Sequence, residues 1–105
     1  MKRVISLSEI FGHIAHPSGP CEVYVSGEAT YDEASSELRV HLDAQLRSTD
    51  LLRKETYHRA AWLPEPRTER ETVESDEARD AAREIFTTWV HQVRETIPRN
   101  ALVHS

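Results

Sequence analysis

Several kinds of residue are scarce in this chain, and each scarcity excludes a class of protein. The 105 residues include one cysteine, Cys21, so no internal disulfide can form. There are only three glycines, and none lies in a phosphate-binding loop. No apolar run approaches the roughly 18 residues that span a bilayer, and the start, MKRVISLSEIFGH, lacks the apolar stretch of a secretory signal. We therefore expect a cytoplasmic protein with no membrane partner.

Positive charge is also in deficit. Thirteen lysine and arginine residues stand against eighteen acidic residues, which gives a formal net charge of −5. A surface built to neutralise phosphates has the opposite balance, so nucleic acid is not expected as the main partner. The length predicts a single domain, residues 1–105, with a small core that a second copy would help to stabilise. A homodimer is therefore expected.

The strongest periodic pattern, at residues 75–97, predicts one long amphipathic helix. Its apolar residues recur at steps of three and four, which places them on one stripe of the helix. They are Ala78, Ala81, Ala82, Ile85, Phe86, Trp89, Val90, Val93 and Ile97. Ser75 is suited to cap the start and Pro98 ends the helix, which leaves residues 98–105 as a flexible tail.

Two segments with alternating hydrophobicity predict strands at residues 22–31 and 37–47. One face of each strand is mainly apolar and the other mainly polar, so the sheet should have one buried and one wet face. The short polar connection at residues 32–35 predicts an antiparallel hairpin. In the register this loop implies, Tyr31 lies opposite Ser36 and Glu28 lies opposite Arg39.

A third strand is predicted at residues 53–63, because Pro64 and Pro66 then end it. Its phase has two alternatives. One turns His58 and Trp62 toward the helix, and the other turns Tyr57 and Arg59 there. We prefer the first because it buries fewer charges. Residues 64–75 are then an exposed charged linker, with a polar edge strand as the alternative.

The N-terminal segment completes the predicted fold. Residues 2–7 are an optional first strand, and Ser8 is suited to cap a short helix that ends at His16. The resulting order is (β)αβββα. We therefore predict an α+β domain in which one long C-terminal helix packs on one face of a three- to four-stranded antiparallel sheet.

No group of residues forms a recognisable reaction centre, so we assign no catalytic residue, no metal and no cofactor. His13, His16 and Cys21 could supply three zinc ligands, but a structural zinc site needs a fourth. His41 and His58 could share a proton or a metal only if both faced water, and the preferred phase separates them. A non-enzymatic protein is the expectation.

Four residues are the candidates for binding a partner. Trp62 either caps the core or belongs to an exposed apolar patch that binds a partner or a second subunit. Arg39, His41 and Arg59 are the candidates on the wet face of the sheet. The first hypothesis is a small interaction or regulatory module that forms a homodimer or binds another protein.

The predicted order of a short helix, three strands and a long helix resembles the double-stranded-RNA-binding domain in topology. That family binds phosphates with lysines at the start of its second helix, where this chain has SDEARDAAR, with Asp76, Glu77 and Asp80. With residues 2–7 as a strand, the order is also similar to the ribosome-associated hibernation factors, which carry two long basic helices. These resemblances imply nucleic-acid binding as the alternative function. The residues that would carry it lie on the wet sheet face: Tyr24, Arg39, His41, Arg47 and Arg59.

Overall fold

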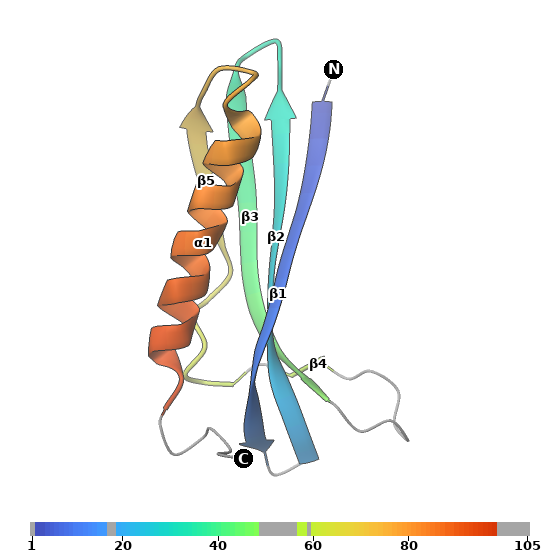
Figure 1. Cartoon of the computed structure of the whole chain (residues 1–105), viewed down its shortest axis with the longest axis vertical. Coiled ribbons are helices and arrows are strands. Elements are labelled where there is room, and N and C mark those ends of the chain that lie inside the picture. Colours follow the sequence, from blue (N-terminus) through green and yellow to red (C-terminus); the bar gives the residue numbers. More distant parts are fainter. Residues whose placement is uncertain (1, 17–18, 49–56, 59, 99–105) are drawn as a thin grey trace.

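The computed structural model describes residues 2–16, 19–48, 57–58 and 60–98. Within these residues, five strands form one antiparallel sheet and a single helix covers one of its faces (Figure 1). The elements are β1 (Lys2–His16), β2 (Gly19–Asp32), β3 (Glu37–Ser48), β4 (Tyr57–His58), β5 (Arg67–Thr72) and α1 (Ala78–Thr96). This is the predicted α+β fold, with the C-terminal helix on one side of the sheet.

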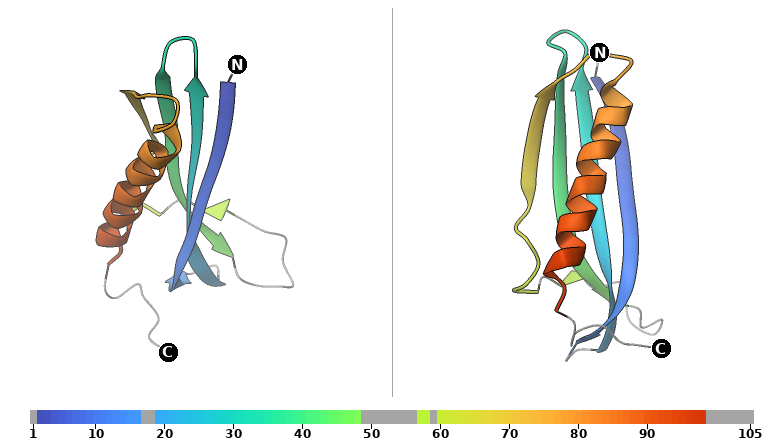
Figure 2. Two further views of the ribbon diagram at one scale, coloured as in Figure 1. Left: turned by 45° about the horizontal axis from the view of Figure 1, so that its top comes forward. Right: turned by 60° about the vertical axis from the view of Figure 1, so that its left-hand side comes forward.

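The three long strands lie side by side in chain order, and β3 shares its other edge between two short strands. Residues 37–42 of β3 pair with β5, and Leu46 and Arg47 pair with β4. Figure 2 shows α1 running along one face of the sheet, with β5 to one side of it and β1 to the other. The helix therefore covers the inner face of the sheet, and no described helix covers the outer face.

The core lies between α1 and the inner face, and it is built by simple alternation. Alternate residues of β2 and β3 point inward and are almost fully buried, as expected for strands with one covered face. With the buried residues of α1 and Leu63 they form one cluster: Cys21, Val23, Val25, Ala29, Tyr31, Leu38, Val40, Leu42, Ala44, Leu46, Leu63, Ala78, Ala82, Phe86, Trp89, Val90 and Val93. The two predicted strands and the helical stripe are thus confirmed.

The predicted helix at residues 8–16 is wrong, because this segment is the second half of the long strand β1. The pairing of β1 with β2 slips by one residue between Phe11 and His13, which is a β-bulge at Gly12. Before the bulge, odd-numbered residues of β1 pair with inner-face residues of β2, and after it even-numbered residues do. Phe11 and Ile14 therefore both pair with inner-face residues of β2, Val23 and Cys21, although their three-residue spacing is typical of a helix.

The hairpin between β2 and β3 forms as predicted, but its register differs by two residues. Asp32 pairs with Glu37, so Glu28 lies opposite His41 and not opposite Arg39. The loop is residues 33–36, because the Asp32 carboxylate accepts a hydrogen bond from the Ala34 N–H at 3.0 Å and Ser36 adopts a left-handed φ of 57°. Asp32 thus closes the turn as its last paired residue, a role that aspartate often takes.

The predicted linker at residues 64–75 contains the edge strand β5, which was the alternative interpretation. Among the described residues of the predicted third strand at 53–63, Tyr57 and His58 form β4 and residues 61–63 form a turn. His58 pairs with Leu46, a residue of the inner face, in agreement with the preferred phase. Residues 49–56, 59 and the predicted tail at 99–105 lie outside the described residues.

The ends of α1 also differ in part from the prediction. The helix begins after Glu77, which makes no side-chain capping bond, whereas Ser75 lies two residues further back and accepts hydrogen bonds from Arg3. At the other end the Ile97 N–H donates to the Arg94 carbonyl at 3.3 Å, and Pro98 follows as predicted. The helix is therefore positioned by its buried stripe and not by an N-terminal cap.

Candidate functional site

The outer face of the sheet is polar and hollowed. An open depression of about 330 Å³ is lined by side chains of three strands, among them Ser6, Tyr24, Ser26, His41 and Asp43. In β2, β3 and β5 this face carries five carboxylates and three guanidinium groups: Glu22, Glu28, Asp32, Glu37 and Asp43, with Arg39, Arg47 and Arg70. The balance of these described side chains is acidic, which does not favour a phosphate backbone as ligand.

His41 is exposed on this face, as predicted. Its Nδ1 lies 3.2 Å from the Thr68 hydroxyl of β5, and Glu28 is its cross-strand neighbour on β2. Arg39 is also exposed and lies 3.4 Å from a carboxylate oxygen of Glu37. Both residues thus contact side chains of the same open surface.

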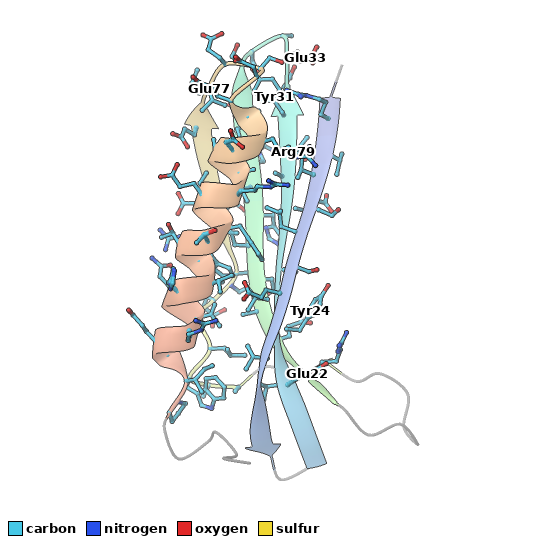
Figure 3. The ribbon with its side chains drawn as sticks, in the orientation of Figure 1. Glu22, Tyr24, Tyr31, Glu33, Glu77 and Arg79 are labelled. Carbon is cyan, nitrogen blue, oxygen red and sulfur yellow. The ribbon has the colours of Figure 1, made fainter. Side chains whose placement is uncertain are left out.

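Arg47 is held firmly against the sheet. Its Nε donates to the Glu22 carboxylate at 2.8 Å, a second guanidinium nitrogen contacts the same oxygen, and the guanidinium lies 5.5 Å from the centre of the Tyr24 ring. Figure 3 shows Glu22 and Tyr24 next to each other on β2. Because both charged side chains are half-buried, this pair stabilises the end of the sheet.

Trp62 belongs to a different part of the molecule. It is half-buried and packs against the core of the inner face, in the turn before β5. The structure therefore does not bring Trp62 together with Arg39 and His41. Arg59, the fourth candidate, lies outside the described residues.

Of the candidate metal ligands, only Cys21 and His41 have side chains that the structure describes. No group of three or more histidine, cysteine, aspartate or glutamate side chains in the described part of the chain could hold an ion. The side chains of His13, His16 and His58 lie outside the described set.

Among the described helices, none is both long and apolar enough to cross a bilayer.

Cys21 is buried at the start of β2 with 1% of its surface exposed, and this burial raises the pKa of its thiol. The reactive species is the thiolate, so burial and a raised pKa both slow its chemistry. We expect a thiol reagent at neutral pH to label the folded protein at least about a hundredfold more slowly than the urea-unfolded protein. Equal rates in the two states, measured by mass spectrometry, would show that Cys21 is accessible.

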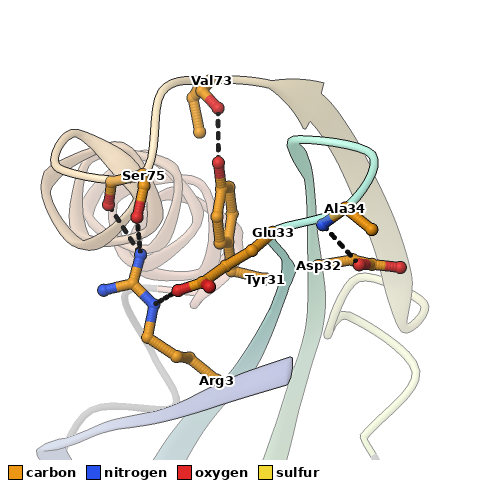
Figure 4. Close-up of polar contacts among 7 residues, drawn as sticks. All are labelled: Arg3, Tyr31, Asp32, Glu33, Ala34, Val73 and Ser75. Atoms are coloured by element: carbon orange, nitrogen blue, oxygen red, sulfur yellow. Dashed lines mark hydrogen bonds and ion pairs between the residues drawn. The ribbon is translucent and has the colours of Figure 1, made fainter. Parts of the chain in front are cut away.

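A guanidinium group ties the start of β1 to two other segments (Figure 4). The Arg3 Nη2 donates to the Ser75 carbonyl at 2.6 Å and lies 3.1 Å from the Ser75 hydroxyl, while Nε is 3.7 Å from a Glu33 carboxylate oxygen. The same group lies 5.1 Å from the centre of the Tyr31 ring, and the Tyr31 hydroxyl donates to the Val73 carbonyl at 2.9 Å. These contacts link the start of β1 to the β2–β3 loop and to the segment before α1.

The outer edge of β1 is the feature that the sequence interpretation missed. β1 is the longest strand, at 15 residues, and it is the last strand on its side of the sheet. No described strand pairs with its other edge. Val4 is 63% exposed there, whereas Ile5 and Leu7 are half-buried against the core. An edge strand of this kind presents unpaired N–H and C=O groups to any other strand.

This chain matches no protein-family model, no curated protein and no solved structure. The assignment of a function therefore rests on the residues and the geometry alone.

Proposed function

We propose that this protein is a non-enzymatic interaction module that binds a partner's β-strand along the free edge of β1. Strand addition uses backbone hydrogen bonds for affinity and the alternating side chains for specificity. The length of β1 supports this proposal, because about ten residues precede the bulge and can form an uninterrupted ladder. The single observation that carries it is the position of this long strand at the end of the sheet.

The two edges of the sheet differ in how they are protected against pairing. The opposite edge is formed by the two-residue β4 and by β5, whose sequence, RTERET, carries a charge at four of six positions. Short strands and charged side chains are the usual protection of an edge. In β1 the six residues from Val4 to Glu9 carry one charge, so this edge is the better docking surface.

The burial pattern also supports a binding role in place of a catalytic one. In the described part of the chain no polar or charged side chain is buried. The one buried thiol, Cys21, lies on the inner face of β2, within the core. General acid–base and nucleophilic chemistry usually depend on groups held in a desolvated cleft. The outer depression is instead open and lined by exposed or half-exposed groups.

The proposal is tested by placing a lysine on the proposed edge. Ser6 is exposed on the outer side of β1, so Ser6→Lys should leave the fold intact and block strand addition. Two readouts are needed: the mass by light scattering over a range of concentrations, and the enrichment of random phage-displayed peptides of about ten residues. We expect association in at least one assay for the wild type, and its loss in Ser6→Lys.

The matched control is Thr72→Lys, an exposed residue of β5 at the opposite edge of the same sheet. It adds the same charge to an edge strand and should behave as the wild type in both assays. If Ser6→Lys and Thr72→Lys give the same mass and the same peptides, the β1 edge is not the binding surface and the proposal is wrong.

A further inference from the structure

We infer that the strand which pairs with β1 is β1 of a second copy, with Ser6 on the two-fold axis. This inference rests on the proposed function, since it names the partner of the same edge. Two identical strands can always pair antiparallel about a two-fold axis, which is the commonest symmetry of soluble oligomers. The question is whether the side chains of β1 are complementary to themselves in any register.

Few registers are possible, because opposite residues of an antiparallel pair share one face of the sheet. In β1, odd-numbered residues up to the bulge pair with inner-face residues of β2, and even-numbered residues pair with outer-face residues. A pair of β1 strands must therefore place odd residues opposite odd residues. Such registers differ from each other by steps of two residues.

The register centred on Ser6 pairs the two inward-pointing charges of β1, Arg3 and Glu9, with each other across the axis. It places Arg3 opposite Glu9 of the other copy, and Ile5 opposite Leu7. Each pair occurs twice across the axis. Opposite charges and apolar pairs directly across an antiparallel ladder are both stabilising, by about 0.2–1 kcal/mol each.

The neighbouring registers lose this match. Centring on Ile5 places Arg3 opposite Leu7, and centring on Leu7 places Arg3 opposite Phe11 and Glu9 opposite Ile5. Inward-pointing charges on an edge strand normally prevent association, because a partner strand cannot satisfy them. Here the two charges satisfy each other in one register only, so they select it.

The contacts of these two charges within one copy leave room for the pairing. The interactions of Arg3 with described residues use Nε and Nη2, which leaves Nη1 for a further acceptor. Glu9 lies 3.8 Å from Arg94 of α1, and both side chains are about half exposed. A second copy would add to these ion pairs without breaking the bonds of Arg3 to Ser75.

Single cysteines on the exposed side of β1 test the register directly. In the proposed dimer two copies of Ser6 face each other at about 4.5–5.5 Å between Cα atoms, within the range of a disulfide. Two copies of Ser8 lie four residues apart along the strands, about 13 Å, and cannot be bridged. We expect Ser6→Cys to form a disulfide-linked dimer at least about tenfold faster than Ser8→Cys under mild oxidation.

The chain offers the remaining controls. The wild type carries only the buried Cys21 and should not cross-link, and Ser26→Cys places a thiol on the same face but on β2, away from the axis. The double variant Val4→Cys/Ser8→Cys should cross-link although neither single variant does, because Val4 lies opposite Ser8 in this register. Cross-linked mass is read on a non-reducing gel and by mass spectrometry.

The outcomes separate the inference from the proposed function. Rapid cross-linking of Ser6→Cys alone among the single variants confirms the register. If Val4→Cys or Ser8→Cys cross-links instead, or if the protein is a monomer that binds peptides at the β1 edge, the inference is overturned while the proposed function stands. A dimer whose mass is the same in Ser6→Lys and in the wild type overturns both.

Discussion

Trp89→Ala should lower the free energy of unfolding by about 3–5 kcal/mol, the cost of removing a large aromatic side chain from a core. Trp89 is 2% exposed, and its indole N–H donates to the Asp43 carbonyl of β3 at 3.0 Å. Asp43 lies in the part of β3 between the residues that pair with β5 and those that pair with β4. The indole therefore joins the helix to β3 next to the residues that pair with β5.

A domain of this size has only about 5–15 kcal/mol of stability, so Trp89→Ala can approach complete unfolding. Trp89→Phe separates the two contributions of the side chain, since it keeps most of the packing and removes the donor. We expect Trp89→Phe to cost about 0.5–1.5 kcal/mol through the loss of the hydrogen bond to the Asp43 carbonyl. Thr87→Ala, on the exposed side of α1, is the control and should stay within about 0.5 kcal/mol of the wild type. Urea unfolding followed by circular dichroism measures all three, and equal midpoints for Trp89→Phe and Thr87→Ala would refute the role of the indole hydrogen bond.

Gly27→Val should also destabilise the protein strongly, at or above the upper end of the about 1–3 kcal/mol typical of overpacking. Gly27 lies on the inner face of β2, directly under Phe86 of α1. A Cβ atom at this position would lie 2.8 Å from Phe86 Cδ2 and 3.3 Å from its Cε2, and the ring is itself buried. The glycine therefore makes space for an aromatic ring and lets the helix approach the sheet.

Gly27→Ala gives a finer test of the same contact. Replacing glycine usually gains about 0.4–1 kcal/mol by restricting the unfolded chain, so a net loss of stability would show that the clash with Phe86 prevails. Phe86→Leu shortens the opposing side chain, and the double variant should be more stable than the sum of the two single effects predicts, by about 1 kcal/mol. Ser26→Ala, the neighbouring residue on the outer face, is the control. Strict additivity in the double variant would show that Gly27 and Phe86 do not compete for space.

The two kinds of test address different surfaces. Trp89 and Gly27 lie where α1 meets the inner face, whereas Ser6, Val4 and Ser8 lie on the outer side of the edge strand. Variants at the edge should leave the unfolding midpoint of a monomer unchanged and alter association alone. A shift of both properties in Ser6→Lys would mean that folding and association are coupled, as in obligate dimers.

Much of the fold follows from local patterns. The stripe of α1 and the alternation in β2 and β3 depend only on neighbouring residues in the chain, because 3.6-residue and two-residue periods assign each side chain to a face. Most of the core, from Val23 to Val93, was predictable for this reason. The polar character of the outer face and the exposure of Arg39 and His41 follow from the same alternation.

The features that carry the proposed function depend on pairing across the chain. One inserted residue at Gly12 reverses the phase of β1 and makes a strand resemble a helix, so the long free edge could not be recognised from periodicity. The hairpin register depends on where Asp32 and Ser36 close the turn, a choice that shifts all pairs by two residues without changing which face is buried. Periodicity assigns faces because it is local, whereas registers, edges and close contacts such as that of Gly27 with Phe86 are decided only when distant segments meet.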